Sequence, residues 1–283
     1  VGPRTNDPPH HDSPGSPGLS CVRARVRSVL DTVRVTRYAV PLREGGSLPG
    51  IVEAADCGTY VAKFRGAGQG LKVLVAEVIV AGIATRLGIR VPRVAVLDLC
   101  ADIARYEADE EVQDLLSASI GTNLGVDFLP GAFGYDGSRP ADREGAEAIL
   151  WLDAFTANVD RTWANPNLLL WHGDLWAIDH GAALWFHHGW PRKAPDPAGF
   201  AAQPFDASDH VLRERCVSLA AVDARATELL TREALVEIVD EVPEDWLETT
   251  DALPTTTDVR HAYVGLLLAR LAGDRPWLPE DLR

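Results

Sequence analysis

Three polar residues between positions 160 and 179 have the types and the spacing that phosphoryl transfer needs. Asn165 follows Asp160 by five positions, and Asp179 comes after two short apolar runs within 168–178. The turn between these runs, His172-Gly173-Asp174, has hairpin chemistry, so the chain should bring Asp179 back to the loop carrying Asp160 and Asn165. One carboxylate could then accept the proton of an attacking hydroxyl, while the amide and the other carboxylate hold Mg²⁺ against phosphates.

This spacing matches the catalytic loop of kinases only in part. In kinases an Asn follows the catalytic Asp by five residues, and a later D-F-G supplies a metal-binding Asp. Here the D-F-G position reads Asp179-His180-Gly181, and Asn158-Val159 stands where protein kinases carry His-Arg. The departure points away from ordinary eukaryotic-type kinases.

The same segment contains a competing register. His172-Gly173-Asp174-Leu175 resembles the H-G-D-L of aminoglycoside phosphotransferases, whose Asp is the base. Five residues after Asp174 stands Asp179 rather than an Asn, and the next acid, Asp196, lies in a Pro-rich stretch unlike a strand. We therefore favour Asp160 as the base. A loop and hairpin with solvated acids is the purely structural alternative.

A lysine and a glutamate upstream could complete such a site. Thr59 to Phe64 is a run of strong β formers with Lys63 inside it, close to the kinase V-A-I-K pattern. The following helix-length stretch, 73–87, is apolar almost all round, and Glu77 is its only acid. Because an unpaired buried carboxylate costs several kcal/mol, we expect Lys63 beside it, as in the ion pair that positions ATP phosphates. An edge-strand lysine and a solvent-facing glutamate are the alternatives.

Two backbone segments are candidates for nucleotide contacts. The turn Gly45-Gly46-Ser47 between two predicted strands could approach phosphates through its N–H groups. The stretch 120–133 mixes Gly with strand formers, as a hinge between lobes does, and its backbone around Val126 and Phe128 could receive adenine. By contrast, the glycines of 66–70 satisfy neither dinucleotide nor Walker spacing, which indicates a connector.

Composition limits the classes of partner. The 283 residues carry a net charge of −14, which argues against a nucleic-acid or anionic-membrane surface. The four cysteines are scattered, which fits a reducing cytoplasm without disulfides. The most apolar stretch is too short to cross a bilayer, which takes about 20 residues. Residues 1–20 should form a disordered leader, and His187 and His188 are expected on a surface loop.

The periodicity along the chain predicts strands first and helices later. Strands are expected within 22–40 and at 51–55, 59–64 and 94–99, in a half-exposed antiparallel sheet. A helix over 142–158 should lead into the catalytic loop, and 182–205 would be the activation or substrate segment. From Asp206 onward the pattern is helical, with predicted helices at 211–230, 232–241 and 259–272.

Taken together, these motifs resemble the HipA-like kinases, particularly the compact actinobacterial type, and the Asp-Arg followed by Asn is also similar to the phosphoinositide-kinase loop. The likeness runs from about Val35 to about Ala183 and is carried by the glycine turn, the Lys63 strand, Glu77 with 87–92, and 158–165. The resemblance implies an α+β, two-lobed protein-kinase-like fold, with an N-lobe over 21–124 and a mostly helical C-lobe over 125–283.

The resemblance also implies an activity and its cofactors. It predicts a Mg-ATP-dependent kinase that phosphorylates Ser or Thr of a protein, with no direct binding of nucleic acid or membrane. The family commonly has His two positions after the catalytic Asp, where this chain has Thr162. A small-molecule or lipid kinase and a nucleotide-binding pseudokinase that acts through partners are the alternatives.

Overall fold

The computed structural model describes residues 1–2, 30–42, 49–105 and 107–283. The predicted glycine turn at Gly45-Gly46-Ser47 and nearly all of the predicted leader lie outside these residues. In the described part of the chain, no helix combines the length and the apolar character that crossing a membrane requires.

Five strands form a small closed barrel in the order β1-β2-β3-β5-β4. They are β1 (Thr32–Pro41), β2 (Gly50–Ala54), β3 (Thr59–Lys63), β4 (Val94–Leu99) and β5 (Gly121–Asp127). Neighbouring strands are antiparallel, as predicted, except that the first residues of β1 pair in parallel with β4. The register of β1 against β2 shifts twice, and such bulges bend a strand, which lets β1 cross from β4 to β2 and close the barrel.

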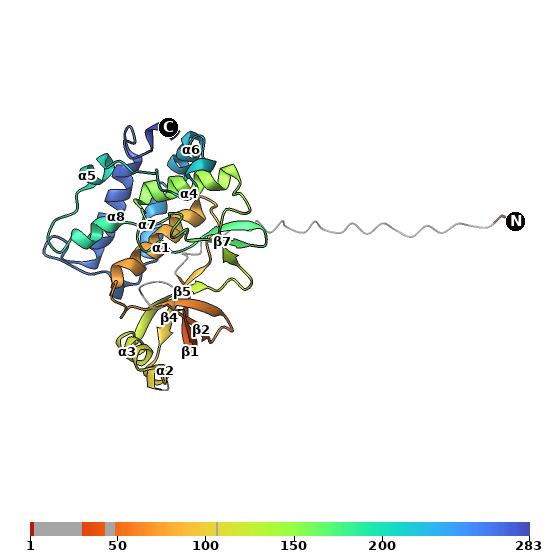
Figure 1. The fold of residues 1–283 in the computed structure, drawn as a ribbon, viewed down its shortest axis with the longest axis vertical. Coiled ribbons are helices and arrows are strands. Elements are labelled where there is room, and N and C mark those ends of the chain that lie inside the picture. Colours follow the sequence, from red (N-terminus) through yellow and green to blue (C-terminus); the bar gives the residue numbers. More distant parts are fainter. Residues whose placement is uncertain (3–29, 43–48, 106) are drawn as a thin grey trace.

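The helix α1 (Leu71–Arg86) lies between the barrel and the helical part of the molecule (Figure 1). Ten of its residues are buried, in agreement with the apolar sequence. It ends where predicted, because Gly88 takes a positive φ of 76° and the N–H of Ile89 bonds back to Ala84 O at 2.9 Å. Two short helices, α2 (Ala101–Arg105) and α3 (Glu110–Ala118), cover the far end of the barrel.

After β5 the chain forms a second sheet of three short strands, β6 (Phe133–Gly134), β7 (Leu168–Trp171) and β8 (Asp174–Ala177). The turn between β7 and β8 has positive φ at His172 (51°) and Gly173 (90°), as a two-residue hairpin requires. The predicted hairpin is therefore confirmed. The predicted lobe boundary between 124 and 125 falls inside β5, whose last residues still pair with β3 and β4.

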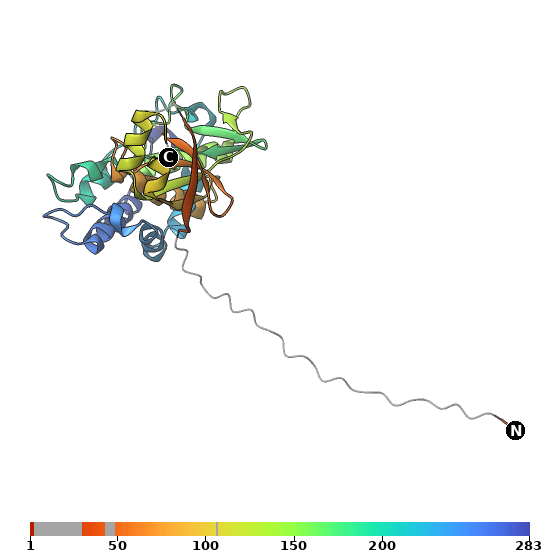
Figure 2. The ribbon, with the colours of Figure 1, turned by 90° about the horizontal axis from the view of Figure 1, so that it is seen from below.

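The rest of the chain is mostly helical and buries the larger core. Its helices are α4 (Arg143–Thr156), α5 (Pro197–Ala202), α6 (Ala220–Leu229), α7 (Arg232–Asp240) and α8 (Thr256–Leu271), with short 3₁₀ turns η1 (Trp185–Gly189), η2 (Arg213–Arg215), η3 (Glu244–Trp246) and η4 (Glu280–Leu282). Figure 2, which looks at the barrel end, shows β1 crossing in front of these helices. The barrel, α1 and the helical part together form the predicted two-lobed, protein-kinase-like fold.

One predicted helix is shorter than expected. The helix predicted over 211–230 begins only at Ala220, because Val211 N donates to Arg161 O at 3.1 Å and His210 forms a β-bridge with Thr162. These contacts hold 210–211 against the loop that carries Asp160 instead of in a helix. Of the strand region predicted within 22–40, residues 22–29 lie outside the described residues, and β1 covers Thr32–Pro41.

Candidate active site

Lys63 lies at the end of β3 and bonds two carboxylates that come from separate parts of the chain. Its Nζ donates to Glu77 Oε1 on α1 and, at 2.8 Å, to Asp179 Oδ1 in the loop after β8. The side chain of Glu77 is 3% exposed and that of Asp179 is 49% exposed. The predicted pairing of Lys63 with Glu77 is confirmed, and Asp179 joins it.

Burial and charge act in opposite directions on these three groups. Burial lowers the pKa of Lys63, but Glu77 and Asp179 raise it by more, so the pKa lies above its ordinary value and the ammonium stays charged. Burial raises the pKa of Glu77 and outweighs the attraction of Lys63. For Asp179 the balance is reversed, and Lys63 holds the pKa of that carboxyl below its usual range despite burial.

The loop after α4 presents Asp160 together with two amides. Asn165 Nδ2 donates to Asp160 Oδ2 at 2.9 Å, and Asn167 Nδ2 donates to the same oxygen at 3.3 Å. A tight turn sets this spacing, because Asn165 N donates to Thr162 O and Thr162 N donates to Asn165 O, both at 3.1 Å. The motif spacing predicted the first amide. It gave no signal for Asn167, which reaches Asp160 because its backbone takes a φ of 48°.

The hairpin brings Asp179 to this loop as predicted. Ile178 N donates to Asn167 O at 3.0 Å, which joins the end of β8 to the end of the Asp160 loop. Asp179 itself has a φ of 53°. Gly181 follows in close contact with α1, where an added Cβ would lie 2.5 Å from Val73 Cγ1. The glycine at this position is therefore needed for α1 and the Asp179 loop to approach each other.

A cavity of about 390 Å³ collects four of the predicted residues: Lys63, Asp160, Asn165 and Asp179. Ala67, Gln69 and Gly70 also line it, so part of the segment interpreted as a plain connector belongs to the site. The chain enters α1 at Gly70, and no side chain caps the first N–H groups of that helix. Such a helix start carries partial positive charge, which favours anions in the cavity.

The two adjacent histidines have different positions. His188 lines the cavity, whereas His187 is fully buried with its Nδ1 2.9 Å from Tyr263 Oη. The expectation of two surface histidines is therefore wrong for His187, because Phe186 of η1, Trp190 directly after it and Tyr263 of α8 pack against its ring.

The predicted adenine contacts lie outside this cavity. Val126 pairs with Val61 on one side and Val94 on the other, and Phe128 N donates to Thr59 O at 3.0 Å. Neither residue lines the cavity. The structure therefore does not bring them together with Lys63 and Asp160, and the adenine position stays a prediction.

The competing base, Asp174, also lies outside the cavity. It begins β8 beside the hairpin turn, half-exposed, and pairs with Arg90 at 3.1 Å. It lines a different hollow, with the start of α4 and Arg225. The geometry thus groups Asp160, and not Asp174, with Lys63.

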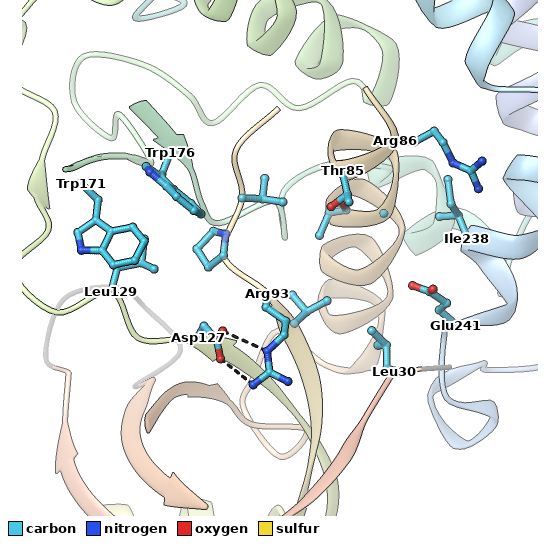
Figure 3. A pocket seen from close by; sticks show the side chains of 15 residues that line it. Leu30, Thr85, Arg86, Arg93, Asp127, Leu129, Trp171, Trp176, Ile238 and Glu241 are labelled. Carbon is cyan, nitrogen blue, oxygen red and sulfur yellow. Dashed lines mark hydrogen bonds and ion pairs between the residues drawn. The ribbon is translucent and has the colours of Figure 1, made fainter. Parts of the chain in front are cut away.

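A larger cavity of about 740 Å³ occupies another part of the molecule and contains none of the predicted site residues. Figure 3 shows Trp171, Trp176 and Leu129 on one side of it, Ile238 and Glu241 on the other, and the paired Arg93 and Asp127 between them. Its size alone does not make it the reaction site, because the groups able to transfer a proton or hold a metal gather in the smaller cavity.

The donor set of the smaller cavity fits Mg²⁺ and a phosphate ligand. In the described residues, no three His, Cys, Asp or Glu side chains cluster as a complete metal site. Mg²⁺ does not need such a cluster, because it is usually bound by one or two carboxylates together with substrate phosphates and water. Asp179 and the amide oxygen of Asn165 are hard ligands of this kind, and Lys63 is suited to a phosphate.

The search of curated proteins found no match. Among solved structures, the Helicobacter pylori proinflammatory kinase CtkA is similar at 11% identity, over 81% of this chain and 89% of that chain, with a TM-score of 0.42. The Golgi casein kinase with Mn/ADP bound is similar at 13% identity, over 86% and 73%, with a TM-score of 0.43.

The family comparison covers most of the chain. The model of the HipA-like kinase family matches residues 35–279, which include the whole barrel from Val35 onward, α1, the Asp160 loop and α8. The protein therefore belongs to the HipA-like kinase family.

Proposed function

We propose that this kinase transfers the γ-phosphate of Mg-ATP to a Ser or Thr hydroxyl of a protein. The observation that carries the proposal is the gathering of Lys63, Asp160, Asn165 and Asp179 in one cavity, although they come from β3, the loop after α4 and the loop after β8. These are the residue types that phosphoryl transfer combines: a base, metal ligands and a phosphate-binding cation.

Asp160 is proposed as the general base. Its Oδ2 accepts hydrogen bonds from Asn165 and Asn167, which hold the carboxylate in place. No group among the described residues bonds its Oδ1. That oxygen can therefore take the proton of an acceptor hydroxyl as the hydroxyl attacks phosphorus.

Asn165 and Asp179 are proposed to hold Mg²⁺, which when bound supplies positive charge against the phosphate oxygens. The pKa of Asp179 is held below its usual range, so the carboxylate is ionised and ready for a cation. Lys63 would contact a phosphate of ATP, and Glu77 would orient the Lys63 ammonium from its buried position on α1. The glycine turn Gly45-Gly46-Ser47 would cover the nucleotide.

The test is phosphate transfer from labelled ATP by the full chain and by two matched variants. Asp160→Asn keeps the shape of the side chain but removes the base, so transfer should fall roughly 10²- to 10⁴-fold while ATP binding persists. Asp174→Asn makes the same chemical change at the competing position and should leave transfer near the wild-type rate. Equal transfer by Asp160→Asn and wild type would refute the assignment.

The same experiment identifies the acceptor class. Label appearing on protein Ser or Thr in a lysate of the source organism is the expected result. Label appearing only on metabolites or lipids would replace the protein acceptor with a small one. Binding of Mg-ATP without transfer to any acceptor would make the protein a pseudokinase.

A further inference from the structure

Arg161, the residue directly after the proposed base, is a fully buried cation bound to a fully buried anion. Its Nε donates to Asp153 Oδ2 at 2.5 Å and its Nη2 to Asp153 Oδ1 at 3.3 Å, and both side chains are 0% exposed. Asp153, on α4, also contacts His210 Nε2 at 3.0 Å. A buried ion pair of this kind is often no more stabilising than apolar residues of the same volume. The ion pair is therefore weak evidence of added stability, and its other hydrogen bonds are of more interest.

The remaining nitrogen of the guanidinium reaches two separate loops. Arg161 Nη1 donates to Asn167 O and, at 3.2 Å, to Ile178 O. Asn167 comes two residues after Asn165, and Ile178 immediately precedes Asp179. A guanidinium group is rigid and planar. The guanidinium of Arg161, anchored by Asp153, therefore fixes the backbone at Asn167 relative to the backbone at Ile178.

The backbone at these two positions is in a conformation that needs external support. Asn167 has a φ of 48° and Asp179 a φ of 53°, in the left-handed region, which Asn and Asp enter more readily than other non-glycine residues but still at an energetic cost. Such residues keep this conformation only when their surroundings fix it. Arg161 donates to the carbonyl of Asn167 and to the carbonyl of Ile178, the residue directly before Asp179. Its Nη2 also lies 3.3 Å from Nδ1 of His180, the residue directly after Asp179.

We propose that Arg161 is a positioning residue that sets the separation of Asn165 and Asp179, and through it the affinity of the site for a divalent metal. The inference rests on the proposed function, because it takes these two side chains as the metal ligands. Arg161 touches neither metal nor substrate. It acts by holding, from one buried group, the backbone that carries each ligand.

The test compares two conservative changes at two fully buried arginines. Arg161→Lys keeps the charge but replaces the guanidinium with a single ammonium, which cannot hold Asp153 and both carbonyls at once. Arg270 on α8 is also 0% exposed and donates to backbone carbonyls, including that of Ala154, which follows Asp153. It does not bond the loop of Asn165 or the loop of Asp179. Arg270→Lys is therefore the matched control for the loss of a buried guanidinium group.

Metal affinity is measured by titrating Mn²⁺ into the full chain with an ATP analogue that cannot be hydrolysed, with free Mn²⁺ read by electron paramagnetic resonance. Thermal unfolding is recorded for every variant. Arg161→Lys should weaken Mn²⁺ binding roughly 10- to 100-fold, as is typical when a group that supports metal ligands is lost. Arg270→Lys should bind Mn²⁺ like the wild type, even if it unfolds at a lower temperature. If Arg161→Lys does not fold, Asp153→Asn, which loosens the anchor of Arg161, should weaken Mn²⁺ binding in its place.

Two results would overturn the proposal: wild-type Mn²⁺ affinity in the folded Arg161 or Asp153 variant, or an equal loss in Arg270→Lys. A wild-type chain that binds no Mn²⁺ would overturn it together with the assignment of Asn165 and Asp179. A wild-type chain that binds Mn²⁺ but transfers no phosphate would refute the proposed activity alone, because the comparison of the arginine variants does not depend on turnover.

Discussion

Lys63 connects the two sides of the candidate active site, since its ammonium bonds one carboxylate from α1 and one from the loop after β8. The two partners differ in their access to solvent: Glu77 is 3% exposed and Asp179 is 49% exposed. Glu77 therefore suits the role of permanent partner. Asp179 can exchange Lys63 for an incoming cation without leaving a buried charge unpaired, because Glu77 still neutralises the ammonium.

A second residue-scale feature makes the fold sensitive to acid. Burial, with smaller contributions from His188 and Lys72, lowers the pKa of His187 well below the usual 6.5. Below pH 6.5 the unfolded chain therefore binds a proton that the folded chain excludes, so stability falls as pH falls, by up to about 1.4 kcal/mol per pH unit for one group. His187→Gln should reduce this slope, measured by urea unfolding at neutral pH and at two values below 6.5.

His261 provides the control, because it is a histidine with an exposed side chain on α8. His261→Gln should keep the wild-type slope. Part of the slope should also persist in His187→Gln, since burial and the neighbouring Arg161 lower the pKa of His180 to about 3. An unchanged slope in His187→Gln would show that the buried ring at 187 is not a source of the acid sensitivity.

At the scale of elements, sequence patterns predicted those features that depend on local chemistry. The apolar stretch of α1, its end at Gly88 and the hairpin turn at His172 each follow from a few adjacent residues. The features that were missed depend on contacts distant in sequence. The parallel pairing of β1 with β4 closes the barrel, and the bridge of His210 to Thr162 shortens the predicted helix over 211–230.

The same distinction holds for the candidate site. The motif spacing predicted that Asp160, Asn165 and Asp179 share one site, because kinases have the same spacing in their catalytic loop. It could not identify Asp153 as the anchor of Arg161, since eight positions and the end of α4 separate the two residues. Nor could it place Gln69 and Gly70 in the cavity, because their position depends on how α1 packs against the Asp179 loop.

The position of α1, and so of Glu77, depends on its close contact with α7. At Gly82 an added Cβ would lie 2.7 Å from Ile238 Cγ2 on α7, a buried β-branched side chain with one strongly preferred χ1 rotamer in a helix. Gly82→Ala should therefore destabilise the protein: overpacking typically costs about 1–3 kcal/mol and outweighs the gain of up to about 1 kcal/mol in helix propensity. Equilibrium urea unfolding measures the difference.

Gly265 on α8 is the matched control, because a Cβ added there meets nothing within 4 Å. Gly265→Ala makes the same substitution in a helix without a steric cost, and it should stabilise the protein by roughly 0.5–1 kcal/mol. Opposite signs for the two variants are the expected outcome. Stabilisation of both would mean that α1 and α7 are less closely packed than the structure shows.

At the scale of the whole molecule, one short segment ties the helical part to the barrel and to α1. Asp245, in η3, pairs with Arg65 just after β3 at 2.8 Å, and Glu248 pairs with Lys72 in the first turn of α1. Between them Trp246 is fully buried, and its Nε1 donates to Thr122 Oγ1 on β5 at 3.0 Å. The segment 244–248 thus connects β5, the start of α1 and the residues just after β3.

Trp246→Ala tests this connection, because it removes the buried indole that holds the segment in place. Deleting a buried aromatic side chain typically costs about 3–5 kcal/mol, so unfolding by urea should begin at clearly lower denaturant concentration. Affinity for Mg-ATP, the proposed substrate, should fall as well, since the segment also holds α1, which carries Glu77, through Lys72. Trp185→Ala removes an indole that is 47% exposed and should change stability much less. Wild-type nucleotide affinity in a folded Trp246→Ala protein would show that the barrel and α1 keep their places without this segment.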